Sequence, residues 1–281
     1  MYLPLLDGSD QVGVMVVTKD AYTDQFFLTR RRAEMSVAAE IQWSLLPPLS
    51  MVVPQVEVAG VLEPAYEVAG DGFDYALNDN ILHVGMIDAM GHGLDAATMA
   101  AVAIGAYRHA RRAEIELSEI YTFMDKAIAE QFDPDHFVTA QMMSLNISTG
   151  HLQWVNAGHP TPLLIRDRAV LEPLESPTTL PVGFGGERPH ISERTLLPGD
   201  RLLCFTDGLI EERQVNGELF GEHRLIESAD RVLRDYATTR AVARKLSHTL
   251  KEARGGVTSD DSTLFLIEWR GGTSDHLAVF D

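Results

Sequence analysis

Residues 81–93 read ILHVGMIDAMGHG, and the predicted fold is built outward from this stretch. The mostly apolar run Ile81–Ile87 predicts a buried β-strand that ends directly at Asp88. A glycine-containing loop follows, and then an alanine-rich segment that predicts a helix over Leu94–Arg112. Glycines let a backbone turn tightly and approach a ligand, so such a loop can hold a metal ion or a phosphate. Taken alone, the pattern is also typical of a strand-to-helix turn capped by an acid.

Other segments repeat this arrangement of an aspartate beside a predicted buried strand. The further aspartates are Asp207, after strand Arg201–Thr206; Asp260 and Asp261, before strand Thr263–Trp269; and Asp71, just upstream of strand Ile81–Ile87. Each could be a turn alone, because Asp-Gly is a common hairpin signal. Together they predict a cluster of carboxylates, which needs a cation to offset its internal repulsion.

The donor atoms indicate the kind of cation. Carboxylate oxygens prefer hard ions, so Mn²⁺ or Mg²⁺ is favoured over zinc. No His-His or Cys-Cys pair in the sequence has zinc-ligand spacing. The single cysteine, Cys204, excludes an internal disulfide and cysteine-based metal cages.

Composition limits the class of protein. The chain has 281 residues, of which 45% are hydrophobic, and this predicts one main domain with an appendage. The formal net charge of -18 would repel phosphate backbones, so nucleic acid is not expected as a partner. No apolar run reaches the roughly 18 residues needed to span a bilayer, and a signal-peptide pattern is missing. We therefore expect a cytoplasmic protein without membrane insertion.

The chain beyond Pro54 predicts a sheet-rich body, because short apolar runs alternate with glycine, asparagine and proline. Further predicted strands are Val56–Leu62, Val138–Ile147, Leu152–Asn156 and Leu163–Arg166, and further predicted helices are Leu117–Gln131 and Ala237–Arg254. Several strands are apolar on both faces, as expected when both faces are covered. The pattern predicts an α+β fold, with layered sheets between helices.

The N-terminal region has a different pattern. Residues 1–19 predict two strands around a turn, which cannot form a core alone. We expect them to be the remnant or tail of an N-terminal regulatory, sensor-like domain. Residues 20–46 contain no glycine or proline and predict a long helix, so that residues 20–48 form a linker that ends at Pro47-Pro48.

The predicted linker helix carries an imperfect coiled-coil seam. Leu28, Met35 and Gln42 recur every seven residues, and Leu45 belongs to a second row. This spacing is compatible with a homodimer held partly through Leu28, Met35 and Leu45. A helix packed on its own domain is an equally good interpretation.

The ordered motifs resemble the bacterial branch of the PP2C-like (PPM) phosphatases, of the SpoIIE/RsbU type. They are AEIQWSLLPP (39–48), AGDGFD (69–74), DAMGHG (88–93), NAGHP (156–160), LPGD (197–200), FTDG (205–208) and DDSTL (260–264). Each is weak alone, but their order is specific. The resemblance covers about residues 38–269 and implies a PP2C-like αββα sandwich over residues 49–272, with 273–281 as a tail.

The resemblance implies a metal-dependent protein serine/threonine phosphatase. Asp88 and Asp207 would be catalytic through a metal-bound water; the ligands of two Mn²⁺ or Mg²⁺ ions would be Asp71, Asp88, the Ala89 carbonyl, Asp207 and Asp260. Expected around these ligands are Asp74, Gly91, His92, His159, Gly208 and Asp261. Two such ions lower the pKa of a water held between them.

Two departures from the family pattern bear on Asp71. Ala69 stands where the family usually has glycine, which would narrow the turn. Gly72 stands where an aromatic is common, which would loosen the wall beside Asp71.

The implied substrate is phosphoserine or phosphothreonine on a regulatory protein, such as a STAS-domain anti-sigma-factor antagonist in a stress response. No arginine corresponds clearly to the substrate-phosphate arginine of eukaryotic relatives. The alternative is a catalytically weak or inactive PPM-fold module that binds a partner.

Other phosphatase classes fit less well. Ile210 stands where a cysteine phosphatase would need arginine after Cys204. Neither Asp88 nor Asp207 is followed by a second acid two residues later, as an aspartyl-phosphate enzyme requires. A calcineurin-like enzyme would need an upstream Asp-x-His and later paired histidines, which are missing.

Overall fold

The computed structural model describes residues 2–7, 10–16, 37–63, 70–211, 219–253 and 260–272. The chain divides into two compact units, Met1–Ser36 and Val37–Asp281. In the first unit, strands β1 (Tyr2–Asp7) and β2 (Asp10–Val16) pair antiparallel, as the turn signal between them predicted. The seam positions Leu28 and Met35, and also Ala69, lie outside the described residues.

The second unit contains two sheets, here called the first and the second sheet. The first has the strand order β10 (Ala169–Pro173), β9 (Leu163–Arg166), β13 (Arg201–Phe205), β14 (Ser262–Trp269), β4 (Val56–Glu63) and β3 (Ser50–Val53). The second has the order β11 (Thr178–Thr179), β8 (His151–Ala157), β7 (Val138–Asn146), β6 (Ile81–Ala89) and β5 (Asp71–Asn78), and β12 (Ser192–Thr195) also pairs with β8.

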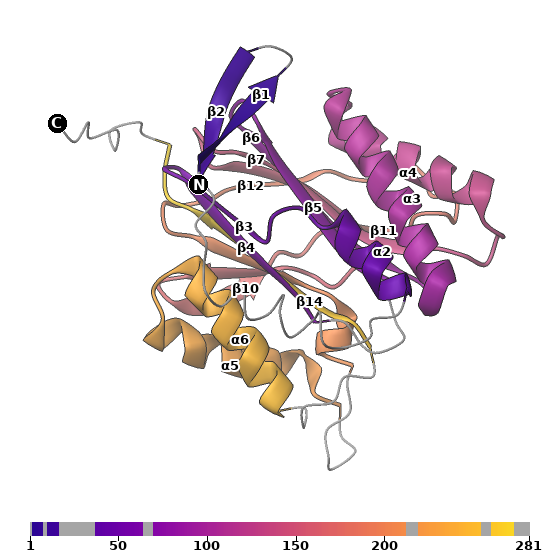
Figure 1. The fold of residues 1–281 in the computed structure, drawn as a ribbon. Coiled ribbons are helices and arrows are strands. Elements are labelled where there is room, and N and C mark those ends of the chain that lie inside the picture. The colour runs from indigo at the N-terminus through magenta and orange to yellow at the C-terminus, as the bar shows by residue number, and fades with distance from the viewer. Residues whose placement is uncertain are drawn as a thin grey trace. The chain divides into compact units, whose positions relative to one another are not determined.

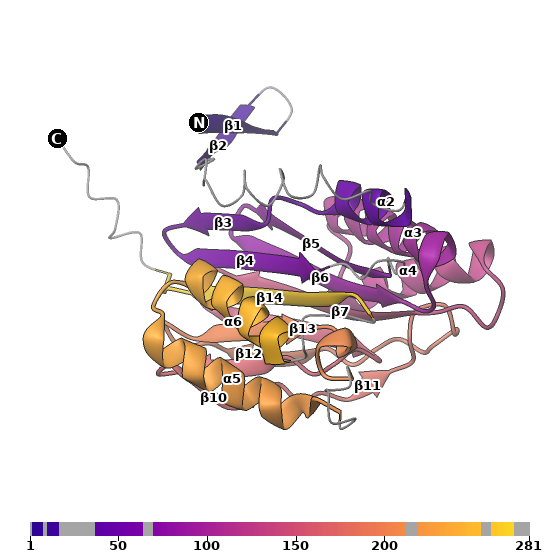
Figure 2. The ribbon, with the colours of Figure 1, turned by 60° about the horizontal axis from the view of Figure 1, so that its bottom comes forward.

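Helices cover the outer faces of both sheets (Figures 1 and 2). α3 (Gly93–Arg112) and α4 (Leu117–Gln131) pack on the second sheet, and α2 (Val37–Leu45) lies beside α3 and β5. α5 (Gly221–Asp235) and α6 (Thr239–Ala253) pack on the first sheet. The inner faces of the sheets meet in one apolar core. This layering confirms the predicted α+β sandwich.

The described helices were also compared with the dimensions of a bilayer. None of them is long and apolar enough to cross a membrane.

Strand β5 shows how alternation directs side chains to the two faces of a sheet. Phe73 and Tyr75 face the core between the sheets, with ring centroids 5.1 and 5.7 Å from that of Phe265. Gly72 faces α3, where an added Cβ would lie 2.9 Å from Ile104 Cδ1. Ile104 therefore occupies the space beside Gly72, and the wall next to Asp71 is packed rather than loosened.

Several elements were not predicted from the sequence. β5 was interpreted as an acidic loop, because aspartate, glycine and asparagine have low strand propensity, yet it pairs along its whole length with β6. α5 was missed because charged residues separate its few apolar ones, although Leu225, Ala229 and Val232 are buried at helical spacing. The shorter strands β3, β10, β11 and β12 were missed as well.

The carboxylate of Asp74 connects β5 with α3, and through Arg108 also with α2. Arg108 Nε and Nη2 donate to Asp74 Oδ1 at 3.0 and 2.7 Å, and Arg111 Nη2 donates to Asp74 Oδ2 at 3.2 Å. Arg108 Nη2 also donates to the Leu45 carbonyl at 2.6 Å. Asp74 was expected near the metal ligands, but strand alternation directs it to the face opposite Asp71. Its partners indicate a role in holding α2 and α3 on the sheet.

We predict that Asp74→Asn lowers the free energy of unfolding by about 3–5 kcal/mol, because it leaves the buried guanidinium of Arg111 without its carboxylate. Urea denaturation monitored by circular dichroism measures this change. The matched control is Glu130→Gln in the exposed Lys126–Glu130 pair, for which a change within about 0.5 kcal/mol is expected. Equal effects of the two variants would contradict the assigned role of Asp74.

Candidate metal centre

The predicted aspartates lie where strands of both sheets end or begin. Asp71 opens β5 and pairs in register with Asp88, near the end of β6. Asp207 lies two residues after the end of β13 and begins a short 3₁₀ turn, Asp207–Leu209. Because β13 and β14 are antiparallel neighbours, the end of β13 lies beside the segment that carries Asp260 and Asp261. The fold therefore brings separate acidic segments of the sequence together at one edge.

Gly208 shows how closely the last two segments approach. A Cβ added to Gly208 would lie 1.9 Å from the Asp261 carbonyl oxygen. Ser262 Oγ also donates to the Gly208 carbonyl at 3.2 Å. Any side chain at position 208 would force the Asp207 and Asp260 segments apart.

The two sheets are joined at this edge by the carboxylate of Asp71. Asp71 lies on the second sheet and is only 3% exposed. Its Oδ2 accepts hydrogen bonds from Thr206 Oγ1 at 2.6 Å and from Thr263 Oγ1 at 2.7 Å, both on the first-sheet side. Thr263 N in turn donates to Thr206 Oγ1 at 3.0 Å. Sequence reasoning missed both threonines, although each lies within three residues of a predicted ligand.

The carboxylates affect one another strongly. Burial, and next the carboxylates of Asp207 and Asp260, raise the pKa of Asp88 to about 8. Asp88 and Asp207 lie close enough for each carboxyl to affect the pKa of the other. Burial, followed by Asp88 and Asp261, raises the pKa of Asp71 well above its ordinary value. Burial also raises the pKa of Asp207.

The Ala89 carbonyl, a predicted metal ligand, lies against Gly70. A Cβ added to Gly70 would lie 2.4 Å from the Ala89 carbonyl oxygen and 3.3 Å from Asp88 Oδ1. Ala89 N donates to the Gly70 carbonyl at 3.1 Å. Glycine at position 70 therefore lets the backbone pass directly beside two of the predicted ligands.

His159 lies beneath this edge of the second sheet. Its Nδ1 is 2.8 Å from Thr139 Oγ1, and Thr139 is the residue opposite Asp88 on β7. Burial lowers the pKa of His159 to about 3, so the ring is neutral. Asn156 exchanges two hydrogen bonds with the His159 backbone and fixes the loop. His159 is therefore placed to support the strand that carries Asp88.

The loop before α3 is open to solvent. Gly91 and His92 are exposed, and Gly91 has a φ of 93°, which favours glycine. His92 precedes the first turn of α3 and makes no side-chain capping hydrogen bond.

Gln42 on α2 contacts the acidic segments directly. It is 2% exposed, and its Nε2 donates to the Asp71 carbonyl at 2.9 Å and to Asp261 Oδ2 at 2.6 Å. The sequence placed Gln42 in a coiled-coil seam. In the structure, α2 instead packs on its own domain through Ala38 and Ala39, and Leu45 packs against the α3–α4 core.

The donor set suits a hard divalent ion, because it consists of carboxylate and carbonyl oxygens. Within the described ranges, no group of three or more Asp, Glu, His or Cys side chains is arranged as a ready-made metal cage. An ion here would need water among its ligands, as Mg²⁺ and Mn²⁺ usually do. Its charge would relieve the repulsion that raises the carboxylate pKa values. By these two criteria, donor chemistry and charge, the residues fit such an ion.

Cys204 is not part of this chemistry. It is buried in the core between the sheets, and burial raises the pKa of its thiol to about 12. A thiolate nucleophile is therefore disfavoured, in agreement with the sequence.

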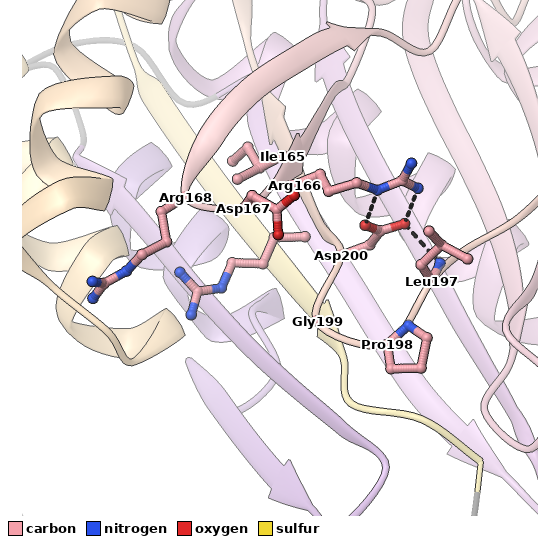
Figure 3. Close-up of a pocket in the computed structure, with 9 residues that line it drawn as sticks. Ile165, Arg166, Asp167, Arg168, Leu197, Pro198, Gly199 and Asp200 are labelled. Atoms are coloured by element: carbon pink, nitrogen blue, oxygen red, sulfur yellow. Dashed lines mark hydrogen bonds and ion pairs between the residues drawn. The ribbon is translucent and has the colours of Figure 1, made fainter.

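A cavity of about 260 Å³ lies at the other end of β13 and contains none of the predicted ligands. Figure 3 shows the side chains of Arg166 and Asp200, two of the residues that line it, pointing toward each other. Arg166 Nε and Nη2 donate to the two Asp200 oxygens at 2.7 Å each, and Leu197 N donates to Asp200 Oδ2 at 2.7 Å. The Asp200 carboxylate thus stabilises the LPGD turn.

Comparison with known families places the chain. Residues 78–270 match the family model described as Stage II sporulation protein E (SpoIIE). The chain belongs to the SpoIIE family. It is 27% identical over 194 residues to the phosphoserine phosphatase RsbP of Bacillus subtilis. The match covers 66% of this chain and 47% of RsbP. The chain thus spans about half the length of this relative.

Solved structures share the fold of this SpoIIE-family chain. The RsbU and RsbW domains of Rv1364c from Mycobacterium tuberculosis match with a TM-score of 0.65 and 27% identity, over 80% of this chain and 63% of that one. The SiaA-PP2C domain of Pseudomonas aeruginosa matches with a TM-score of 0.68 and 21% identity, over 89% of this chain and 99% of that one. The catalytic domain of the phosphatase PstP, solved with 2 manganese ions, matches with a TM-score of 0.54 and 17% identity, over 76% and 98%.

We predict that Thr263→Val destabilises the fold by about 1–3 kcal/mol, because it removes one of the two hydroxyl donors to the buried Asp71 carboxylate. Urea denaturation in the presence of a chelator measures this change. Thr98→Val, an exposed helical threonine, is the matched control, with an expected change within about 0.5 kcal/mol. A Thr263 variant as stable as its control would show that the bridge contributes no stability.

Proposed function

We propose that this chain is a Mn²⁺- or Mg²⁺-dependent protein serine/threonine phosphatase. The observation that carries the proposal is the convergence of acids at one edge of the two sheets: Asp71 lies opposite Asp88, and Asp207 follows β13 beside the segment with Asp260. Membership of the SpoIIE family supports the same activity, and RsbP is named as a phosphoserine phosphatase.

In this proposal Asp88 and the Ala89 carbonyl would help to hold two divalent ions. Asp207 and Asp260 would contribute ligands to one ion, and Asp71 to the other, directly or through water. Bound divalent ions would supply positive charge for the phosphoryl oxygens and a water of lowered pKa. The manganese-containing PstP structure supports this choice of ion.

The protein's own groups would hold these acids in place. Thr206 and Thr263 fix the Asp71 carboxylate by hydrogen bonds to Oδ2, and Oδ1 would remain for a cation. Glycines 70 and 208 allow the backbone segments to close on one another. His159 stays neutral and adds no positive charge that would compete with a cation.

The proposed substrate is a phosphoserine or phosphothreonine on a regulatory protein, with a STAS-domain anti-sigma-factor antagonist as the preferred candidate. The similarity to RsbP and to a protein that contains RsbU and RsbW domains supports this choice. A purified phosphorylated STAS protein, incubated with the chain and Mn²⁺, tests it by phosphate release. Hydrolysis of an aryl phosphate but not of this protein would redirect the search to another phosphoprotein. The second candidate function remains an inactive binding module.

We predict that hydrolysis of an aryl phosphate or a phosphoprotein requires added Mn²⁺ or Mg²⁺ and stops when a chelator is added. Asp88→Asn and Asp207→Asn should each lower kcat by about 10²-fold or more at saturating Mn²⁺, because each removes a negative charge from the proposed site. Circular dichroism should show an intact fold in both variants.

The matched control is Asp167→Asn in the exposed turn between β9 and β10, where φ is 51° and asparagine is well tolerated. This variant should keep the activity of the unmodified chain. Undiminished turnover after complete chelation would refute the metal mechanism. Metal binding without any hydrolysis would favour the inactive binding module.

We propose, finally, that residues 1–19 belong to a regulatory domain, that residues 20–48 form a linker, and that residues 49–272 form the catalytic domain followed by a tail, 273–281. The division between Ser36 and Val37 supports a separate N-terminal unit. We further propose a homodimer formed through the linker by Leu28, Met35 and Leu45, although Leu45 packs partly on its own domain.

Deletion of residues 1–35 should weaken this dimer and change the Mn²⁺ dependence of activity at the same time. Analytical ultracentrifugation of the full and the truncated chain measures the first effect, and Mn²⁺ titration of activity measures the second. A full-length monomer with the same Mn²⁺ dependence as the truncated chain would rule out control through dimerisation.

A further inference from the structure

Gln42 connects three segments that are far apart in the sequence. It lies on α2, and its side-chain amide reaches the backbone at the start of β5 and the carboxylate just before β14. The residues that it contacts are Asp71, a proposed ligand, and Asp261, the neighbour of the proposed ligand Asp260. α2 is therefore bonded directly to both acidic segments, independently of α3 and α4.

The side-chain amide of Gln42 is held by hydrogen bonds as well as by packing. Both partners of its Nε2 are acceptors, so only the NH₂ side of the amide can face them. The opposite atom, Oε1, is buried and has no hydrogen-bond partner in the described part of the protein. An apolar side chain would avoid the cost of burying Oε1. The free-energy cost of burying Oε1 must therefore be offset by the hydrogen bonds that Nε2 makes to the acidic segments.

Gln42 also suits the charge of its surroundings. Asp261 is 1% exposed and lies close enough to Asp71 to contribute to its raised pKa. A neutral donor such as an amide stabilises a carboxylate without adding a positive charge that would repel a metal ion. Lysine or arginine at this position would place such a charge beside the proposed ligands.

We infer that Gln42 is a positioning residue for the proposed metal centre: with α2 docked on α3, its amide holds the Asp71 and Asp260–Asp261 segments at the spacing that binds a divalent ion. This inference rests on the proposed function. Displacement of α2 would break both hydrogen bonds together. The proposed linker would then act on the metal centre through one side chain.

The test compares Gln42→Met, which keeps the approximate volume but removes both donors, with the unmodified full chain. Free Mn²⁺ is measured by electron paramagnetic resonance in the absence of substrate, and aryl phosphatase activity is titrated with Mn²⁺ in parallel. Gln42→Met should raise the half-saturating Mn²⁺ concentration about tenfold or more, while kcat at saturating Mn²⁺ changes little. If Gln42 contributed only to stability, Gln42→Met would not raise the half-saturating Mn²⁺ concentration while kcat stayed nearly unchanged.

The matched control is Gln141→Met. Gln141 is also a buried glutamine with one donated hydrogen bond, to the Val155 carbonyl at 3.2 Å, and an unpartnered Oε1 among the described residues. It should lower stability without changing Mn²⁺ affinity. Asp261→Asn completes a double-mutant cycle with Gln42→Met, and the two effects on Mn²⁺ affinity should be clearly non-additive.

Four outcomes would overturn the inference. Equal Mn²⁺ affinity of Gln42→Met and the unmodified chain, or an equal shift in Gln141→Met, removes the positioning role and leaves the proposed function standing. Additive effects in the cycle show that the contact with Asp261 does not carry the role. An unmodified chain that binds no Mn²⁺ refutes the proposed function, and the inference fails with it.

Discussion

The carboxylate of Asp71 is buried between two sheets and accepts hydrogen bonds from Thr206 and Thr263 on the opposite sheet. A buried carboxylate is costly unless such donors surround it. This contact therefore fixes the edge at which the sheets meet, and it does so where the other acids lie. Asp88 lies near the end of β6, and Asp207 begins the turn after β13, so their separation follows from the same contact.

Repulsion within the acidic cluster limits the stability of the metal-free protein. The raised pKa values of Asp71, Asp88 and Asp207 mean that burial and mutual proximity disfavour the charged forms. A divalent ion would reverse this balance, since it stabilises the carboxylates in the form that binds it. The crowding of these carboxylates would therefore favour a bound cation.

Asp71 and Asp74, three residues apart on β5, have different roles. Asp71 faces the core between the sheets, whereas Asp74 faces the helices and pairs with Arg108 and Arg111. Arg108 also donates a hydrogen bond to the carbonyl of Leu45 at the end of α2. Gln42, within α2, donates hydrogen bonds to the acidic segments. α2 is thus held by an ion-pair network at one point and by the candidate site at another. A change in α2 would act on both.

The positions of Asp88, Asp207 and Asp260 beside buried strands could be predicted from the sequence, because apolar runs begin or end next to these acids and the pattern is local. The sequence by itself also determined the layered fold, since strands that are apolar on both faces need cover on both sides. β5 could not be predicted from the sequence, because aspartate and glycine have low strand propensity. The threonines that donate hydrogen bonds to Asp71 were not predicted either. The sequence placed Gln42 in a dimer seam. These features depend on the folded chain: β5 is a strand because it pairs with β6, and the roles of Gln42 and the threonines come from contacts between residues more than a hundred positions apart, such as Asp71 with Thr206 and Gln42 with Asp261.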